Sequence, residues 1–130
     1  MSGAHDIQRG KRQVLIVDDD ESIRSLLNLY FEQAGYEAAT AETGEYALER
    51  FEVGRFHLVM LDYYMPGMNG LEAASAMHVR DPGVMIVLIT GMAHALAHVD
   101  LAPTGIIRIF SKPFDICEIA DWLQSLSELD

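Results

Sequence analysis

The chain has 130 residues, half of them hydrophobic, which suits one folded domain with a sizeable core and excludes an intrinsically disordered chain. Its formal net charge of -11 disfavours direct binding to nucleic acids or anionic membranes, because their phosphates would be repelled. The single cysteine excludes an internal disulfide and favours a reducing, cytoplasmic setting.

The beginning of the chain differs from the rest in composition. Residues 1–12 are mostly polar and lack the apolar middle of a secretion signal, so we expect a flexible leader before one domain over residues 13–128. The longest apolar stretch, over residues 84–93, is too short to cross a bilayer. We therefore expect no membrane partner.

The first half of the domain is predicted to fold as strand, helix, strand, helix. Residues 14–17 are continuously apolar, as in a strand buried on both faces, and three aspartates follow them. Asp20 is suited to cap the next helix, which a glycine ends. Residues 36–41 predict a weaker strand nearer the sheet edge, and a threonine caps a second helix over residues 43–52.

The second half repeats this alternation. Residues 57–62 predict a buried strand that ends at one carboxylate, and a turn rich in Pro and Gly leads into a helix from Gly70. The most apolar strand covers residues 84–90 and ends in a hydroxyl. The weakest helix prediction covers residues 92–101, because a proline follows closely. A fifth strand over residues 106–110 precedes a last amphipathic helix.

This order predicts an α/β fold of five βα units. Short apolar strands that alternate with amphipathic helices are typical of a doubly wound, five-stranded parallel sheet with helices on both faces. Ligands of such sheets bind outside the carboxyl ends of the strands. The residues that follow the strands are therefore the candidates for a functional site.

Polar side chains follow four of the five strands: Asp18 and Asp19, Asp62, Thr90, and Lys112. Carboxylates that converge repel each other and need a cation or a proton, and oxygen ligands without His or Cys favour Mg²⁺ over Zn²⁺. A carboxylate beside Mg²⁺ can attack a phosphoryl group, while the ammonium and the hydroxyl stabilise its oxygens. The sequence therefore predicts a phosphoryl-accepting site.

Over residues 14–126 the chain resembles the receiver domain of bacterial two-component response regulators. The matching motifs are Val17-Asp18-Asp19, Asp62 with Met65-Pro66 and Asn69-Gly70, Thr90-Gly91, and Lys112-Pro113-Phe114. Each motif is weak alone, but their order and their places at the strand ends make the set specific. The resemblance implies the flavodoxin-like receiver fold, with strand order 2-1-3-4-5.

The resemblance also implies a signalling switch and not an enzyme that acts on a separate metabolite. Asp62 is the expected phosphoacceptor, which receives the phosphoryl group from a histidine kinase or a histidine phosphotransfer protein. Phosphorylation from small donors and autodephosphorylation are the only reactions expected. The phosphorylated form is expected to regulate an output domain or target protein, and the family suggests a homodimer through the last two helices and the fifth strand.

Further site residues follow from the same resemblance. Asp19 and Asp18, together with the phosphoacceptor and the backbone carbonyl of Tyr64, are the expected ligands of Mg²⁺, which Mn²⁺ could replace. Thr90 is the expected switch hydroxyl, which moves to the phosphoryl group. Lys112 is expected to form an ion pair with the same phosphoryl group. The bond between Lys112 and Pro113 is expected to be cis, which is inexpensive only before proline.

One position departs from the family pattern. The aromatic switch residue usually lies three positions before the lysine, where this chain has Ile109, and Phe110 comes one place later. One place along a strand means the opposite face. Either Ile109 fills the same space without a ring, or activation is read out elsewhere.

Two other functions stay open. The segment from Asp18 to Ser22 loosely resembles the start of the haloacid-dehalogenase-like phosphatases, whose nucleophile would then be Asp18, but this leaves Asp62 without a role. The other alternative is a protein-binding scaffold that is never phosphorylated. The acidic pocket argues against it, because such a scaffold would not need carboxylates that repel each other. His94 and His98 have the spacing of a helical metal pair but no evident third ligand, so we expect an exposed face there.

Overall fold

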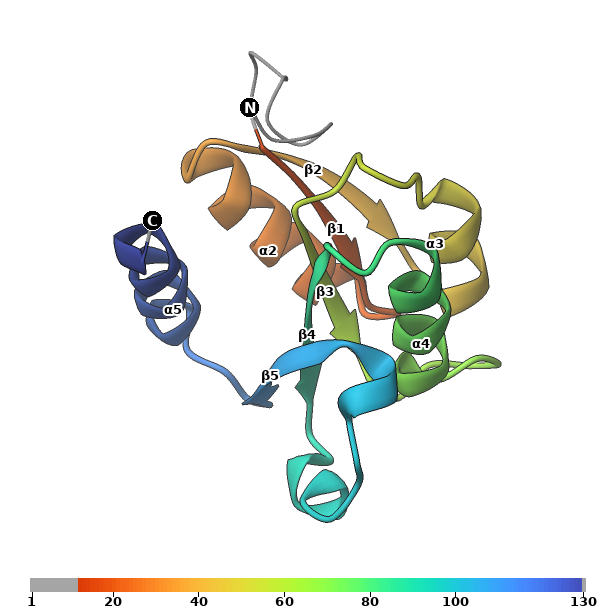
Figure 1. Cartoon of the computed structure of the whole chain (residues 1–130). Coiled ribbons are helices and arrows are strands. Elements are labelled where there is room, and N and C mark those ends of the chain that lie inside the picture. The colour runs from red at the N-terminus through yellow and green to blue at the C-terminus, as the bar shows by residue number, and fades with distance from the viewer. Residues whose placement is uncertain (1–11, 130) are drawn as a thin grey trace.

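The computed structural model describes residues 12–129 (Figure 1). Within these residues five strands and four α-helices build one α/β domain, and their boundaries follow the sequence pattern closely except between the last two strands. The expected leader lies outside the described residues except for Arg12, which begins the first strand. None of the described helices is long and apolar enough to span a membrane.

The five strands form one parallel sheet in the order β2-β1-β3-β4-β5. They are β1 (Arg12–Val17), β2 (Tyr36–Ala41), β3 (Leu58–Asp62), β4 (Met85–Thr90) and β5 (Ile106–Ser111). The three central strands are the most apolar and the most buried, and the weaker β2 lies at an edge, as its sequence predicts. The predicted fold class and strand order are confirmed.

Helices cover both faces of the sheet, with α3 (Gly44–Arg50) and α4 (Gly70–Arg80) on one face and α2 (Glu21–Gln33) and α5 (Ile116–Leu129) on the other (Figure 1). Successive side chains of each strand point to opposite faces of the sheet and so form two hydrophobic cores. Leu15 and Val59 pack toward α3 and α4, whereas Ile16 and Met60 pack toward α2 and α5 with Phe31. Both cores include buried residues near the carboxyl ends of the strands, such as Val17, Leu61 and Ile89, so the loops there start from packed positions.

Side-chain caps fix where three helices begin. Asp20 accepts a hydrogen bond from the backbone N–H of Ser22 at the start of α2, and Thr43 accepts one from Tyr46 at the start of α3. Asn69 forms a reciprocal capping box with Glu72 at the start of α4. The caps predicted at Asp20 and Thr43 are confirmed.

The segment between β4 and β5 is not the α-helix that was expected. It contains two short 3₁₀ turns, η1 (Ala93–Leu96) and η2 (Ala102–Thr104). Among residues 92–100 only Leu96 is buried, so an α-helix would have no apolar face to pack, and packing supplies most of a helix's stability. Pro103 and the left-handed Gly105 then turn the chain into β5.

Strand β5 contains an irregularity that decides which way its side chains face. Ile86 pairs with Ile106 but Val87 pairs with Arg108, so Ile107 is an extra residue and is exposed. After this bulge Ile109 packs against the core under α3 and α4, and Phe110 lies in the opposite core, with its ring edge-on to Trp122. The two residues thus face opposite sides, as predicted.

Candidate functional site

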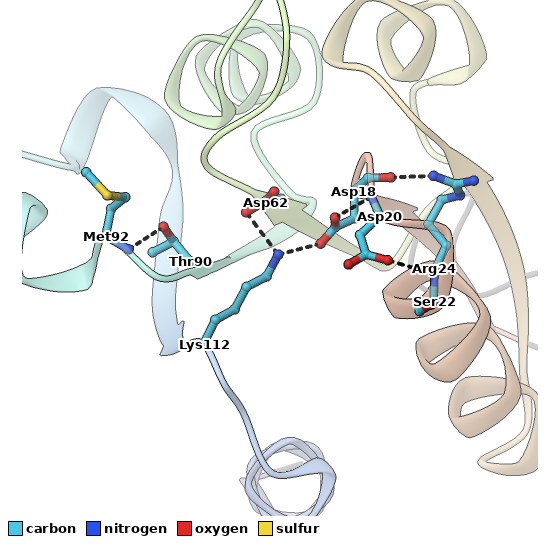
Figure 2. Close-up of polar contacts among 8 residues, drawn as sticks. All are labelled: Asp18, Asp20, Ser22, Arg24, Asp62, Thr90, Met92 and Lys112. Atoms are coloured by element: carbon cyan, nitrogen blue, oxygen red, sulfur yellow. Dashed lines mark hydrogen bonds and ion pairs between the residues drawn. The ribbon is translucent and has the colours of Figure 1, made fainter.

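The predicted site residues meet at the carboxyl edge of the sheet (Figure 2). β1 leads into Asp18, β3 ends at Asp62, β4 ends at Thr90, and Lys112 directly follows β5. They border a pocket of about 610 Å³. Its lining consists of Asp19, Asp20, Asp62, Tyr64, Thr90, Gly91, Met92 and Lys112. This volume is sufficient for a small ligand.

Lys112 bridges two buried carboxylates. Its Nζ lies 2.9 Å from Oδ2 of Asp18 and 3.3 Å from Oδ1 of Asp62 (Figure 2). The two aspartates are only 2% and 6% exposed, so each needs a nearby positive charge. The backbone holds the lysine in place, because its N–H donates to the carbonyl of Thr90 and the peptide bond to Pro113 is cis, as expected.

Asp18 is held from four directions. Its Oδ1 accepts the backbone N–H of Asp20 at 2.9 Å, while its Oδ2 contacts the Lys112 ammonium. Its own N–H donates to the carbonyl of Ala41, and its carbonyl accepts a hydrogen bond from Nη1 of Arg24 at 2.8 Å (Figure 2). The acidic loop is therefore ordered by contacts within the chain. Sequence reasoning missed Arg24, because its position one turn into α2 carries no motif.

The pKa values of Asp62 and Lys112 are both raised, but by different balances of burial and neighbouring charge. Burial raises the pKa of Asp62, the negative charge of Asp18 raises it further, and Lys112 only partly opposes this. Burial lowers the pKa of Lys112, but the hydrogen bonds and charges of Asp18 and Asp62 outweigh it, so the net shift is upward. The lysine therefore stays protonated. A further cation near Asp62 would stabilise its charged carboxylate form.

The carboxylates also form a candidate metal centre. One oxygen each from Asp18, Asp19 and Asp62 lie within 4.8 Å of one another, and Asp19 is exposed. A set made only of carboxylate oxygens fits a hard cation such as Mg²⁺. No second such group occurs within residues 12–129, and His94 and His98 are exposed.

Thr90 is fully buried at the end of β4 and borders the pocket. Its Oγ1 accepts a hydrogen bond from the backbone N–H of Met92 at 2.8 Å (Figure 2). The hydroxyl thus ties the pocket to the first residues of the segment between β4 and β5. The Met92 side chain is 45% exposed and lines the pocket, a role that its sequence position did not suggest.

The loop between β3 and α4 passes close behind Asp62. Gly70 donates its N–H to the carbonyl of Tyr63 at 2.8 Å, which folds the loop back onto the strand. A Cβ on Gly70 would lie 2.5 Å from the carbonyl oxygen of Asp62 and 2.9 Å from the Cα of Tyr63. Only glycine permits this approach. Tyr64 follows at the mouth of the pocket, with a side chain that is 76% exposed.

Comparison with known proteins points in the same direction as this geometry. Residues 14–124 match the model of the response regulator receiver domain. The sporulation initiation phosphotransferase F of Bacillus subtilis is 38% identical over 109 residues, which make up 84% of this chain and 88% of that protein.

Solved structures agree in both fold and sequence. The response regulator protein TrrA of Thermotoga maritima, in complex with Mg²⁺-BeF, superposes with a TM-score of 0.77 at 36% identity and covers 88% of this chain and 98% of its own. The same protein has been solved in complex with the histidine kinase ThkA, with a TM-score of 0.75 and 35% identity, covering 88% of this chain and 97% of that one.

Proposed function

We propose, because this chain belongs to the response regulator receiver domain family, that its role as a phosphoacceptor switch is carried by Asp62. The observation that supports this most is the convergence of a buried carboxylate, two further aspartates and a lysine at one edge of the sheet. Within this group Asp62 is the member that is buried at the last position of a central strand and lies next to the lysine. The proposed receiver domain covers residues 13–128.

In the proposed reaction an oxygen of Asp62 attacks the phosphorus of a phosphohistidine. The new P–O bond gives an acyl phosphate, the P–N bond breaks, and its electron pair leaves with the imidazole nitrogen, which a proton from solvent can neutralise. Lys112 already lies 3.3 Å from the attacking carboxylate, so its ammonium is placed to pair with the transferred oxygens. The chain itself supplies the nucleophile and this charge.

We assign Mg²⁺ to Asp18, Asp19, Asp62 and the backbone carbonyl of Tyr64. The three carboxylates fit a hard cation, and the TrrA complex with Mg²⁺-BeF supports the assignment by similarity. When bound, Mg²⁺ would neutralise charge on the phosphoryl oxygens. Mn²⁺, which also takes oxygen ligands, would serve in its place.

Thr90 is the proposed switch. When its hydroxyl turns to donate to the phosphoryl group, its hydrogen bond with the Met92 N–H is lost, and the segment after β4 must adjust. Ile109 packs in the core on this side of the sheet, so we propose that it occupies the space of the usual aromatic residue without a ring.

The proposed phosphodonor is a histidine kinase or a histidine phosphotransfer protein, by similarity to TrrA, which was solved with the kinase ThkA. The output is an attached domain or a separate target. Relatives of both sorts exist, since the chain spans 88% of the sporulation phosphotransferase but only 23% of the regulatory protein AtoC of Escherichia coli. A homodimer through η1, η2, β5 and α5, and a cytoplasmic location, complete the proposal.

The phosphatase alternative has less support. An Asp18 nucleophile would leave Asp62 without a role, although Asp62 is buried and lies 3.3 Å from the Lys112 ammonium. We therefore expect no turnover of phosphate esters, and only self-phosphorylation and autodephosphorylation.

Intact-mass spectrometry tests the proposal. The protein is incubated with Mg²⁺ and acetyl phosphate, next to Asp62→Asn and to a sample with EDTA. A gain of one phosphoryl group in the wild-type protein with Mg²⁺, and in neither control, is the expected result. Equal uptake by Asp62→Asn would contradict the assignment of the phosphoacceptor.

A further inference from the structure

The loop between β3 and α4, residues 63–69, has an inner and an outer part. The inner part is held by the main chain and the core, because Gly70 bonds to the carbonyl of Tyr63 and the side chain of Met65 is buried. The outer part, at the exposed Gly67 and the half-buried Met68, is contacted by another element. That element is the beginning of α3.

Two adjacent residues of α3 contact this outer part. Oε2 of Glu45 accepts a hydrogen bond from the backbone N–H of Met68 at 3.0 Å. The same carboxylate lies against Gly67, where a Cβ would come within 2.7 Å of Oε2. A Cβ on Gly44 would lie 3.3 Å from the Met68 side chain, which covers that glycine. One carboxylate therefore fixes the main chain of the loop from outside.

Glu45 does not belong to the metal-binding group or to the lining of the pocket. Apart from the through-space effect of its charge, Glu45 can therefore act on the site only through the loop. The loop presents the Tyr64 carbonyl, which lies four positions before the tethered N–H of Met68. Ordering that loop before the cation arrives removes an entropic cost that binding would otherwise carry.

We propose that Glu45 is a positioning residue for the divalent cation, which holds the loop so that the Tyr64 carbonyl faces the carboxylates. This inference rests on the proposed function, because it assumes a cation at Asp18, Asp19 and Asp62. It names a residue of α3 that acts on the site only by accepting a hydrogen bond.

The test compares three variants by NMR titration of backbone amides with Mg²⁺. Glu45→Ala removes the acceptor, whereas Glu45→Gln keeps an acceptor oxygen and loses the charge. Glu49→Ala is the matched control, because Glu49 is exposed on the same helix and its side chain has no hydrogen bond or ion pair to any described residue. Hydrogen exchange at the Met68 amide is measured in each variant as a second readout.

Loss of one hydrogen bond of this kind predicts a Kd for Mg²⁺ about threefold to tenfold higher in Glu45→Ala, with faster exchange at Met68. Glu45→Gln and Glu49→Ala are expected to stay within about twofold of the wild-type Kd, because the acceptor is kept or was never involved. Phosphoryl uptake at saturating Mg²⁺ should reach the wild-type extent in all three.

Two results would overturn the inference while leaving the proposed function intact. Faster exchange at Met68 with an unchanged Kd would show that the tether does not position the cation ligand. An equal rise of Kd in Glu45→Ala and Glu49→Ala would show that the weaker Mg²⁺ binding comes from the lost negative charge and not from the lost hydrogen bond. A wild-type protein that binds no Mg²⁺ would instead refute the proposed function, and this inference with it.

Discussion

Replacing Lys112 with methionine is predicted to destabilise the metal-free protein and to make its stability depend strongly on Mg²⁺. Methionine keeps most of the side chain's length but removes the charge that separates Asp18 from Asp62. The two carboxylates are 2% and 6% exposed and would then face each other without a cation. A divalent ion could restore the lost neutralisation.

The magnitude follows from the geometry. Carboxylate oxygens of Asp18 and Asp62 lie within 4.8 Å of each other, and at an effective dielectric constant of about 20 two like charges at that distance repel by about 3.5 kcal/mol. The Lys112 side chain is a quarter exposed, and Asp62 can take up a proton, so we expect a net loss of about 2–3 kcal/mol. A domain of this size would lose about 6–12 °C in Tm.

Thermal and urea unfolding near neutral pH, in EDTA and in saturating Mg²⁺, measure this loss. Mg²⁺ should stabilise Lys112→Met more than the wild-type protein, because the ion replaces the ammonium and binds only the folded state. Arg108→Met is the control, since it removes a positive charge from an exposed position of β5, the strand that Lys112 follows, and should cost less than about 1 kcal/mol. A loss in EDTA below about 0.5 kcal/mol, or equal stabilisation by Mg²⁺ in both proteins, would refute the reasoning.

Three further predictions concern neighbouring groups. Because burial and the charge next to it raise the pKa of Asp62, its contribution to metal-free stability is fully present below the unfolded pKa of 3.8 and is lost as pH rises through the folded pKa. The urea midpoint of the wild-type protein should therefore fall relative to Asp62→Asn as pH rises over this range, and parallel curves would contradict this. Thr90→Val should cost about 1 kcal/mol in urea unfolding, because the Met92 N–H loses its acceptor, and an unchanged midpoint would argue against that bond. Gly70→Ala should cost about 2–4 kcal/mol by calorimetry, since the new Cβ meets backbone atoms, whereas Gly83→Ala, with only an ordinary 3.6 Å contact, should stay within about 1 kcal/mol of wild type.

The sheet and most of the site could be predicted because their signals are local. Four of the strands are short apolar runs, and polar residues follow at the edge where parallel strands must meet. Asp18, Asp62 and Lys112 lie far apart in sequence, yet the strand order alone brings them together. The caps at Asp20 and Thr43 follow from side chains that bond their own helix starts.

What could not be predicted depends on tertiary packing. The alanines between β4 and β5 favour a helix, but that segment has a single buried residue, Leu96, and so forms 3₁₀ turns. The bulge at Ile107 that turns Ile109 toward α3 and α4 follows from pairing with β4 and leaves no mark in the sequence. Glu45 reaches a backbone N–H of a loop 23 positions away, and Arg24 folds back onto the carbonyl of Asp18, and neither contact has a motif.

Identification of the phosphorylated residue tests the central claim most directly. The protein is phosphorylated with acetyl phosphate and Mg²⁺, the acyl phosphate is reduced with borohydride to homoserine, and peptides are sequenced by mass spectrometry. Homoserine at position 62 alone is the predicted result. Homoserine at position 18 or 19, or a phosphoryl group on any other residue with position 62 unmodified, would contradict the account.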